Sequence, residues 1–84
     1  MPTKARPVKS LRSRHHQQLI ELLSETRTVA GLTQQQLAER LYRPQSFVAK
    51  YEGGERRIDV VEFIHIARAM NADPIRLLQK LLKN

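Results

Sequence analysis

Hydrophobic residues recur at three- and four-residue spacing from Ser13 onward, and this spacing is typical of an amphipathic helix. The apolar positions of the first such segment are Leu19, Leu22 and Leu23. The pattern runs to Ala30 and is followed by Gly31, a residue that readily takes the left-handed conformation at the end of a helix. We therefore predict a first helix over residues 13–30.

Two capping boxes predict further helix starts. Thr33 and Gln36 are three residues apart, so the threonine hydroxyl can accept the Gln36 amide while the glutamine side chain reaches back. Asp59 and Glu62 repeat this spacing. They predict a short second helix through about residue 41 and a fourth helix after residue 59. The predicted apolar face of the fourth helix consists of Val61, Ile64, Ala67 and Met70.

Two prolines predict the remaining helix starts. Pro44 cannot continue the second helix but suits the first turn of a third one, which runs to Glu52 and ends at the two glycines after it. Asp73 and Pro74 open a last helix in the same way. The apolar positions of this last helix are Ile75, Leu78, Leu81 and Leu82. No segment has the pattern of a strand, so the prediction is an all-α, compact five-helix bundle.

Basic residues are concentrated at the start of the chain. The 84-residue chain carries a net charge of +7, and its first fourteen positions hold five of the fifteen basic residues and no acidic residue. We expect a flexible basic arm over residues 1–12, followed by one folded domain over residues 13–84. This charge favours a polyanionic partner, nucleic acid before an anionic membrane. The alternative for the arm is a solubilising tail.

The second and third predicted helices have the pattern of a helix-turn-helix. Its expected buried set is Leu37, Ala38, Leu41, Val48 and Tyr51. Ala38 is small, as the close crossing of the two helices requires. The remaining positions of the third helix face outward, where a recognition helix enters the major groove. These outward residues are Gln45, Ser46, Ala49 and Lys50.

Residues 15 to 82 resemble the phage-repressor and Cro-like helix-turn-helix regulators, the XRE family. The matching text is GLTQQQLAERLYRPQSFVAKYEGGERR, followed by DVVEFIHIARAM and DPIRLL. The resemblance implies a lambda-repressor-like fold and a sequence-specific transcription regulator that binds double-stranded DNA. It also assigns Gln45, Ser46, Ala49 and Lys50 to base reading, and Gln45 suits adenine while Lys50 suits guanine.

The same resemblance implies a second set of residues that contact the DNA backbone. These residues are Gln34, Arg43, Phe47, Arg56 and Arg57. At the start of the second helix, Gln34 stands where unpaired amides favour a phosphate. Tyr42 departs from the family, which usually has glycine with positive φ there, and tyrosine in that conformation costs on the order of 1 kcal/mol. Arg43 replaces a residue that is usually apolar, so the turn is expected to differ in detail.

Several other classes of function are disfavoured. The chain contains no cysteine, no Walker-type loop, and no triad or carboxylate pair with supporting sequence. The adjacent His15 and His16 point about 100° apart on a helix, which favours a surface pair over a metal site. We expect His65 to be structural or exposed. The expectation is a cytoplasmic non-enzyme with no cofactor, no metal and no membrane partner.

The leading hypothesis is a repressor that binds a pseudo-palindromic operator as a homodimer. The basic arm would follow the DNA backbone or enter the minor groove. The dimer surface is expected on the last helix, at Leu77, Leu78, Leu81 and Leu82, although these residues can instead close the monomer core. The alternatives are an antitoxin, a restriction–modification controller or prophage regulator, and a module that binds an unknown protein partner.

Overall fold

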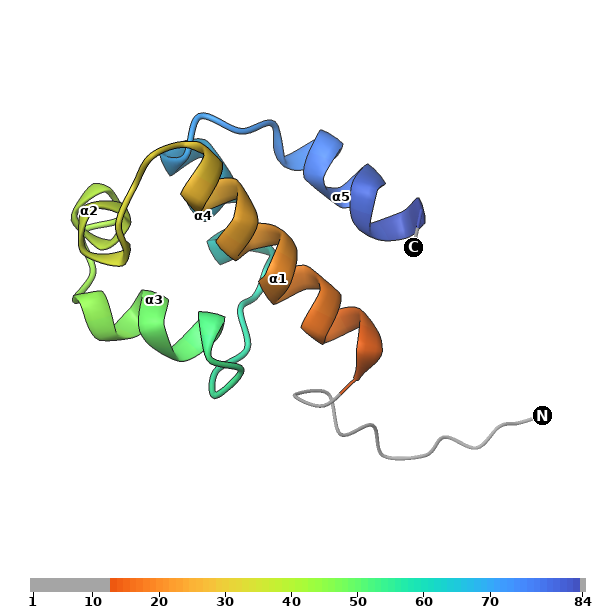
Figure 1. Cartoon of the computed structure of the whole chain (residues 1–84), viewed down its shortest axis with the longest axis horizontal. Helices are drawn as coiled ribbons and strands as arrows, with labels where there is room; N and C mark the ends of the chain where they lie inside the picture. The colour runs from red at the N-terminus through yellow and green to blue at the C-terminus, as the bar shows by residue number, and fades with distance from the viewer. Residues whose placement is uncertain (1–12, 84) are drawn as a thin grey trace.

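The computed structural model describes residues 13–83, which form five helices and no strand (Figure 1). The helices are α1 (Arg14–Val29), α2 (Gln34–Arg40), α3 (Gln45–Glu52), α4 (Val60–Ala69) and α5 (Pro74–Lys83). The predicted all-α bundle is confirmed. The basic arm predicted at residues 1–12 lies outside the described residues. None of the helices between residues 13 and 83 is long and apolar enough to cross a membrane.

Side-chain caps start the helices where the sequence predicts them. The backbone N–H of Gln36 donates to Oγ1 of Thr33 at 3.0 Å, and Oε1 of Gln36 accepts the Thr33 N–H at 2.9 Å. The Asp59 and Glu62 pair forms the same capping box at the start of α4. One start differs by a residue, because Pro44 has extended backbone (φ −67°, ψ 154°) and is the N-cap of α3.

Each of the four connections between the helices contains one residue with left-handed backbone, and two of these residues bear on the sequence predictions. Gly31 has φ +76°, and a Cβ added there would meet no atom within 4 Å, so conformation and not space favours glycine. Tyr42 has φ +57° in the turn between α2 and α3, and its side chain is 96% exposed. The turn therefore keeps the positive φ that the resemblance implied, and tyrosine bears its strain without packing to offset it.

The core lies where the first four helices meet, and α5 closes it. Its largest fully buried side chains are Leu23, Leu37, Val48, Tyr51 and Ile66. Ala38 is 1% exposed and lies in α2, which packs against α3, as its small size led us to expect. Leu41 packs against this core while half-buried. In Figure 1, α1 lies between α3 and α5, and it packs against both.

The predicted apolar face of α4 was correct only in part. Ala67 and Met70 are buried together with Ile66, whereas Ile64 is half-buried and Val61 is 58% exposed. Each residue turns a helix by about 100°, so the nine steps from Val61 to Met70 place them on opposite sides. A strict three-residue spacing drifts around the helix, and the true buried face alternates steps of three and four.

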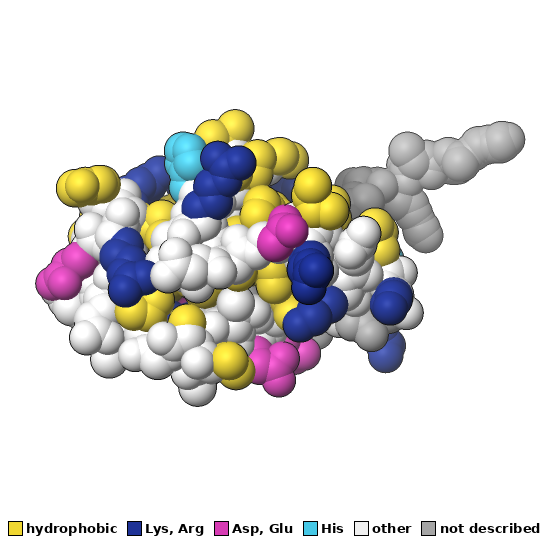
Figure 2. Space-filling model, turned by 90° about the horizontal axis from the view of Figure 1, so that it is seen from above, with side chains coloured by type: hydrophobic (Ala, Val, Ile, Leu, Met, Phe, Trp, Pro, Cys, Tyr) yellow, Lys and Arg dark blue, Asp and Glu magenta, His cyan; other side chains and the backbone are white. Residues whose placement is uncertain are grey.

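Several large apolar side chains remain exposed, and Figure 2 shows some side chains of this kind on the face seen from above. They are Val29, Tyr42, Val60, Val61, Ile75, Leu78 and Leu82. Three of them belong to α5. Single exposed apolar residues are common, so only a group on one element suggests an interaction surface.

Candidate nucleic-acid interface

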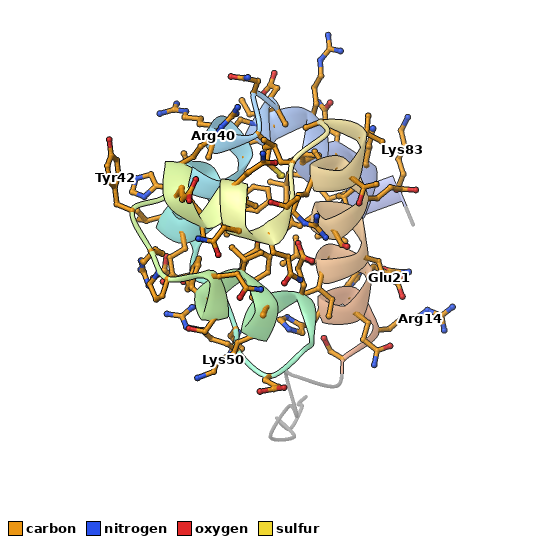
Figure 3. The ribbon with its side chains drawn as sticks, turned by 60° about the vertical axis from the view of Figure 1, so that its left-hand side comes forward. Arg14, Glu21, Arg40, Tyr42, Lys50 and Lys83 are labelled. Atoms are coloured by element: carbon orange, nitrogen blue, oxygen red, sulfur yellow. The ribbon has the colours of Figure 1, made fainter. Side chains whose placement is uncertain are left out.

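The helix α3 presents a polar edge to solvent at the surface of the bundle. Gln45, Ser46 and Lys50 are exposed, and Ala49 is half-buried beside them. Figure 3 shows Lys50 pointing away from the bundle. The structure therefore brings together all four residues expected to read bases, with Ala49 offering a methyl group only.

Gln45 is hydrogen-bonded before any partner arrives. Its Nε2 donates to Oε1 of Gln34, across the helix-turn-helix, at 2.9 Å. In turn, Nε2 of Gln34 donates to Oε1 of Glu52 at 3.0 Å. A glutamine amide has two N–H groups and an oxygen with two lone pairs, so Gln45 keeps its oxygen and one N–H for an adenine edge.

Glu52 is fixed by an ion pair with α1. Arg27 donates from Nε to Oε2 of Glu52 at 2.8 Å and from Nη2 to Oε1 at 3.0 Å. Its Nη1 also donates to the carbonyl of Leu32, and the hydrogen bond to Glu52 raises the pKa of the guanidinium. Both side chains are mostly buried, so the bidentate pair is firmly placed. A continuous chain of hydrogen bonds thus connects α1 to the first residue of α3.

Sequence reasoning missed this chain of contacts. It gave Gln34 a phosphate-binding role and gave Arg27 and Glu52 none. A cation and an anion 25 residues apart carry no local signal, unlike a capping box. In the structure, Gln34 is half-buried and one N–H of its side chain remains for a phosphate.

Phe47 does not take the position expected of a DNA contact. Its side chain is 7% exposed and belongs to the core. The ring packs edge-on against Tyr51, with centroids 5.4 Å apart and planes at 71°. Residues 47, 48 and 51 follow the three- and four-residue spacing of an inward face, so α3 turns Phe47 away from its polar edge. We correct the expectation that Phe47 contacts DNA.

Arg43 and Arg56 lie over the Phe47 ring, with their guanidinium carbons 4.3 and 4.8 Å from its centroid. Both donate to the carboxylate of Glu62, Arg56 through two nitrogens at 3.0 and 2.9 Å and Arg43 through Nη2 at 3.2 Å. The hydrogen bond from Arg56, together with smaller contributions from Asp59 and Arg43, lowers the pKa of Glu62 to about 2. Arg57 is exposed and makes no ion pair within residues 13–83.

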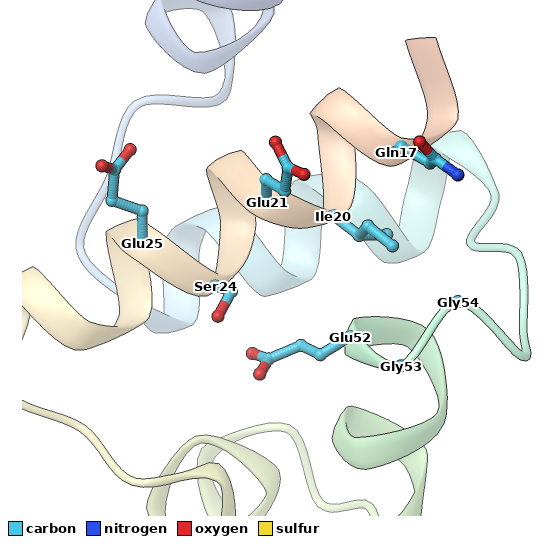
Figure 4. A pocket seen from close by; sticks show the side chains of 8 residues that line it. All are labelled: Gln17, Ile20, Glu21, Ser24, Glu25, Glu52, Gly53 and Gly54. Carbon is cyan, nitrogen blue, oxygen red and sulfur yellow. The ribbon is translucent and has the colours of Figure 1, made fainter. Parts of the chain in front are cut away.

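An open groove of about 570 Å³ lies between α1 and the end of α3 (Figure 4). Its acidic side chains are those of Glu21, Glu25 and Glu52, which do not suit an anion. Between residues 13 and 83, no three His, Cys, Asp or Glu side chains are grouped as metal ligands. His15 and His65 are exposed, and His16 is half-buried.

Comparisons with known proteins agree with this geometry. A family model described as a helix-turn-helix domain matches residues 9–78. The chain is similar to the solved structure of an XRE-family like protein from Pseudomonas syringae pv. tomato str. DC3000, with 52% identity and a TM-score of 0.80. That match covers 82% of this chain and 84% of the other. A search of curated proteins finds no match.

Two restriction–modification controller proteins are also similar. C.AhdI from Aeromonas hydrophila shares 29% identity and a TM-score of 0.71, over 77% of this chain and 98% of that one. C.Esp1396I, solved as a tetramer with its natural 35 base-pair operator, shares 17% identity and a TM-score of 0.78, over 86% and 95%. At that identity, the second likeness supports the fold alone.

Proposed function

The chain belongs to the XRE-like helix-turn-helix family of non-enzymatic, DNA-binding transcription regulators, and we propose that it is a repressor that binds a pseudo-palindromic operator as a homodimer. The observation that carries this proposal is the exposed polar edge of α3, with the Gln45 amide held by Gln34. A DNA-binding role also implies that the protein acts in the cytoplasm.

Base reading is assigned to the polar edge of α3. Gln45 offers adenine N6 and N7 an acceptor and a donor in one plane, and Lys50 donates to guanine O6 or N7. Ser46 bonds to either kind of base, and the Ala49 methyl packs against a thymine methyl. The exposure of Gln45, Ser46 and Lys50 supports these roles.

Backbone contact is assigned to residues that flank this edge. Arg57 is exposed and free of ion pairs among the described residues, so its charge is available to a phosphate. Arg43 and Arg56 remain partly exposed, at 44% and 38%, while they bind Glu62. Gln34 retains one N–H for a phosphate, although its main contacts position Gln45. The basic arm, if it follows the DNA, would extend this footprint.

A second copy of the chain is proposed to pair through α5. Ile75, Leu78 and Leu82 are exposed and lie on one face of this helix, at spacings of three and four residues. Leu77 is buried in the monomer core and Leu81 is half-buried, so only Leu78 and Leu82 of the four residues expected from the sequence are exposed for pairing. Since α1 lies between α3 and α5, pairing through α5 would keep both recognition helices clear of the interface, as binding to two half-sites requires.

The alternative biological role is control of a restriction–modification system. It is favoured by the similarity to C.AhdI, which covers 98% of that controller. This role uses the same DNA surface and differs only in the regulated gene. An antitoxin or a prophage regulator would use the same DNA surface and would differ in the same way. A protein-binding module is less well supported, because it has no use for the exposed polar side chains of Gln45, Ser46 and Lys50.

Selection of duplexes from a random library with the purified protein tests the proposal. We expect an inverted repeat to be recovered, and two chains to bind each selected duplex. Recovery of a single half-site with one chain bound would contradict the homodimer. Recovery of no consensus would contradict sequence-specific regulation.

A further inference from the structure

Glu62 at the start of α4 joins both ends of the recognition helix. Arg43 lies in the turn before α3 and Arg56 in the loop after it, and their guanidinium groups meet on one carboxylate. We propose that Glu62 raises the ratio of specific to random DNA affinity by holding Arg43 and Arg56 back from the phosphates of random DNA. This inference rests on the proposed sequence-specific binding.

The geometry fixes both guanidinium groups. Arg56 uses Nη1 and Nη2 on Glu62, and Nη1 also donates to the Arg57 carbonyl at 2.7 Å. The Phe47 ring lies beneath both groups, and cation–π contact with a buried ring adds to the ion pairs. The side chain of Glu62 is only 14% exposed, so dissolved salt screens these pairs less than it screens surface charges.

Arg43 and Arg56 do not act as two free cations in this cluster. One carboxylate neutralises about half of the charge of two guanidinium groups, and a phosphate must compete with it for the same N–H groups. Random DNA is held almost entirely by phosphate attraction, so the loss of free cations weakens that binding directly. Glu62 therefore lowers the affinity of the protein for random DNA.

Glu62 weakens binding to a correctly docked operator less than it weakens binding to random DNA. Arg43 still has exposed N–H groups while it donates to Glu62 through Nη2. A guanidinium that is already placed loses little conformational freedom when a phosphate reaches it. The held arginines thus contribute to the docked complex but not to diffuse contacts, and this difference raises the ratio of specific to random affinity.

Two glutamate variants with the same change in charge test the proposal. Glu62→Gln removes the charge but keeps an oxygen for the Asp59 N–H, which now donates to Oε1 of Glu62 at 3.0 Å. Glu39→Gln is the matched control, because Glu39 is exposed in α2. Within residues 13–83 its carboxylate accepts a hydrogen bond only from Gln35 and makes no ion pair. The readout is affinity for the selected and a scrambled duplex across salt concentrations.

We expect Glu62→Gln to steepen the salt dependence on scrambled DNA by roughly one to two units, as one or two arginines reach phosphates. The ratio of specific to random affinity should fall several-fold. Adding Arg56→Ala to Glu62→Gln should remove most of the increase in salt slope on scrambled DNA. In the otherwise wild-type chain, Arg56→Ala should change the salt slope on scrambled DNA less than Arg57→Ala does. This comparison does not depend on how Glu62→Gln folds.

The inference is overturned if Glu62→Gln and Glu39→Gln behave alike on both duplexes, or if Arg56→Ala and Arg57→Ala lower the salt slope equally. Failure of the wild-type protein to distinguish the two duplexes is a different outcome. It would contradict the proposed sequence-specific function itself.

Discussion

Nε2 of Gln45 lies 2.9 Å from Oε1 of Gln34, so the first residue of α3 is hydrogen-bonded to the first residue of α2. This contact orients the Gln45 amide before DNA arrives. Bidentate binding to adenine needs the amide oxygen and nitrogen in the plane of the base, and prior ordering lowers the entropy lost on binding. Gln34 is positioned in turn by its hydrogen bond to Glu52, whose carboxylate is paired with Arg27.

Removal of the Gln45 side chain should weaken binding to the selected duplex and leave binding to scrambled DNA nearly unchanged. We expect Gln45→Ala to lose roughly 1–3 kcal/mol on the selected duplex, because a bidentate base contact is lost, with little change on scrambled DNA. Titration of both duplexes at one salt concentration measures this. An equal loss on both duplexes would show that Gln45 does not read a base.

Gln34 should act through Gln45. We expect Gln34→Ala to weaken binding to the selected duplex less than Gln45→Ala does. The double variant should bind about as weakly as Gln45→Ala alone, since the positioning contact has no value without the group it positions. Full additivity of the two losses in a double-mutant cycle would instead mean that the two side chains act independently, for example with Gln34 on a phosphate.

Glu62 should make stability depend on acid pH. Its pKa is lowered from 4.5 to about 2, so its contribution is complete above about pH 4.5 and is lost as the pH falls toward 2. Denaturant unfolding of the wild type and Glu62→Gln from pH 6 to pH 2 measures the difference. We expect the wild type to be more stable at pH 6 and the gap to narrow on acidification. A gap that stays constant with pH would contradict the ion-pair assignment, and Glu39→Gln serves as the control.

Substitutions in α5 should distinguish residues that pair two chains from residues that stabilise the folded monomer. Leu82→Asp places a charge on the exposed stripe of α5, so we expect it to shift the dimer to monomer while thermal unfolding of the monomer changes little. Leu77→Ala removes a buried side chain and should destabilise the monomer by roughly 2–5 kcal/mol. Sedimentation of both variants, with Val60→Asp as an exposed control, distinguishes these roles. A Leu82→Asp protein that remains dimeric would exclude α5 as the interface.

Local rules predicted most of the fold. The capping boxes at Thr33 and Asp59, the left-handed Gly31 and the proline before α3 each depend on residues within a few positions, so the helix order followed from the sequence. Val61 was wrongly placed on the buried face of α4, because a three-residue spacing was extended over nine positions, where its drift reaches half a turn.

The candidate site was predictable only in part. Gln45, Ser46 and Lys50 are exposed, as the helical pattern of α3 required. Phe47 was misplaced because the family resemblance was followed in preference to the inward face that it shares with Val48. The partners of Gln34 and Arg56 were not predictable, since they depend on how α1 and α4 pack against the helix-turn-helix and not on local spacing.

Sequence reading by the polar edge of α3 can be tested by equilibrium binding. The wild-type protein is titrated with the library-selected duplex and with a scrambled duplex of the same composition, at several salt concentrations. We expect the selected duplex to be bound at least about 10³-fold more tightly. We also expect a clear difference to persist as salt weakens both complexes. Equal affinities with the same salt slope would contradict sequence reading by α3.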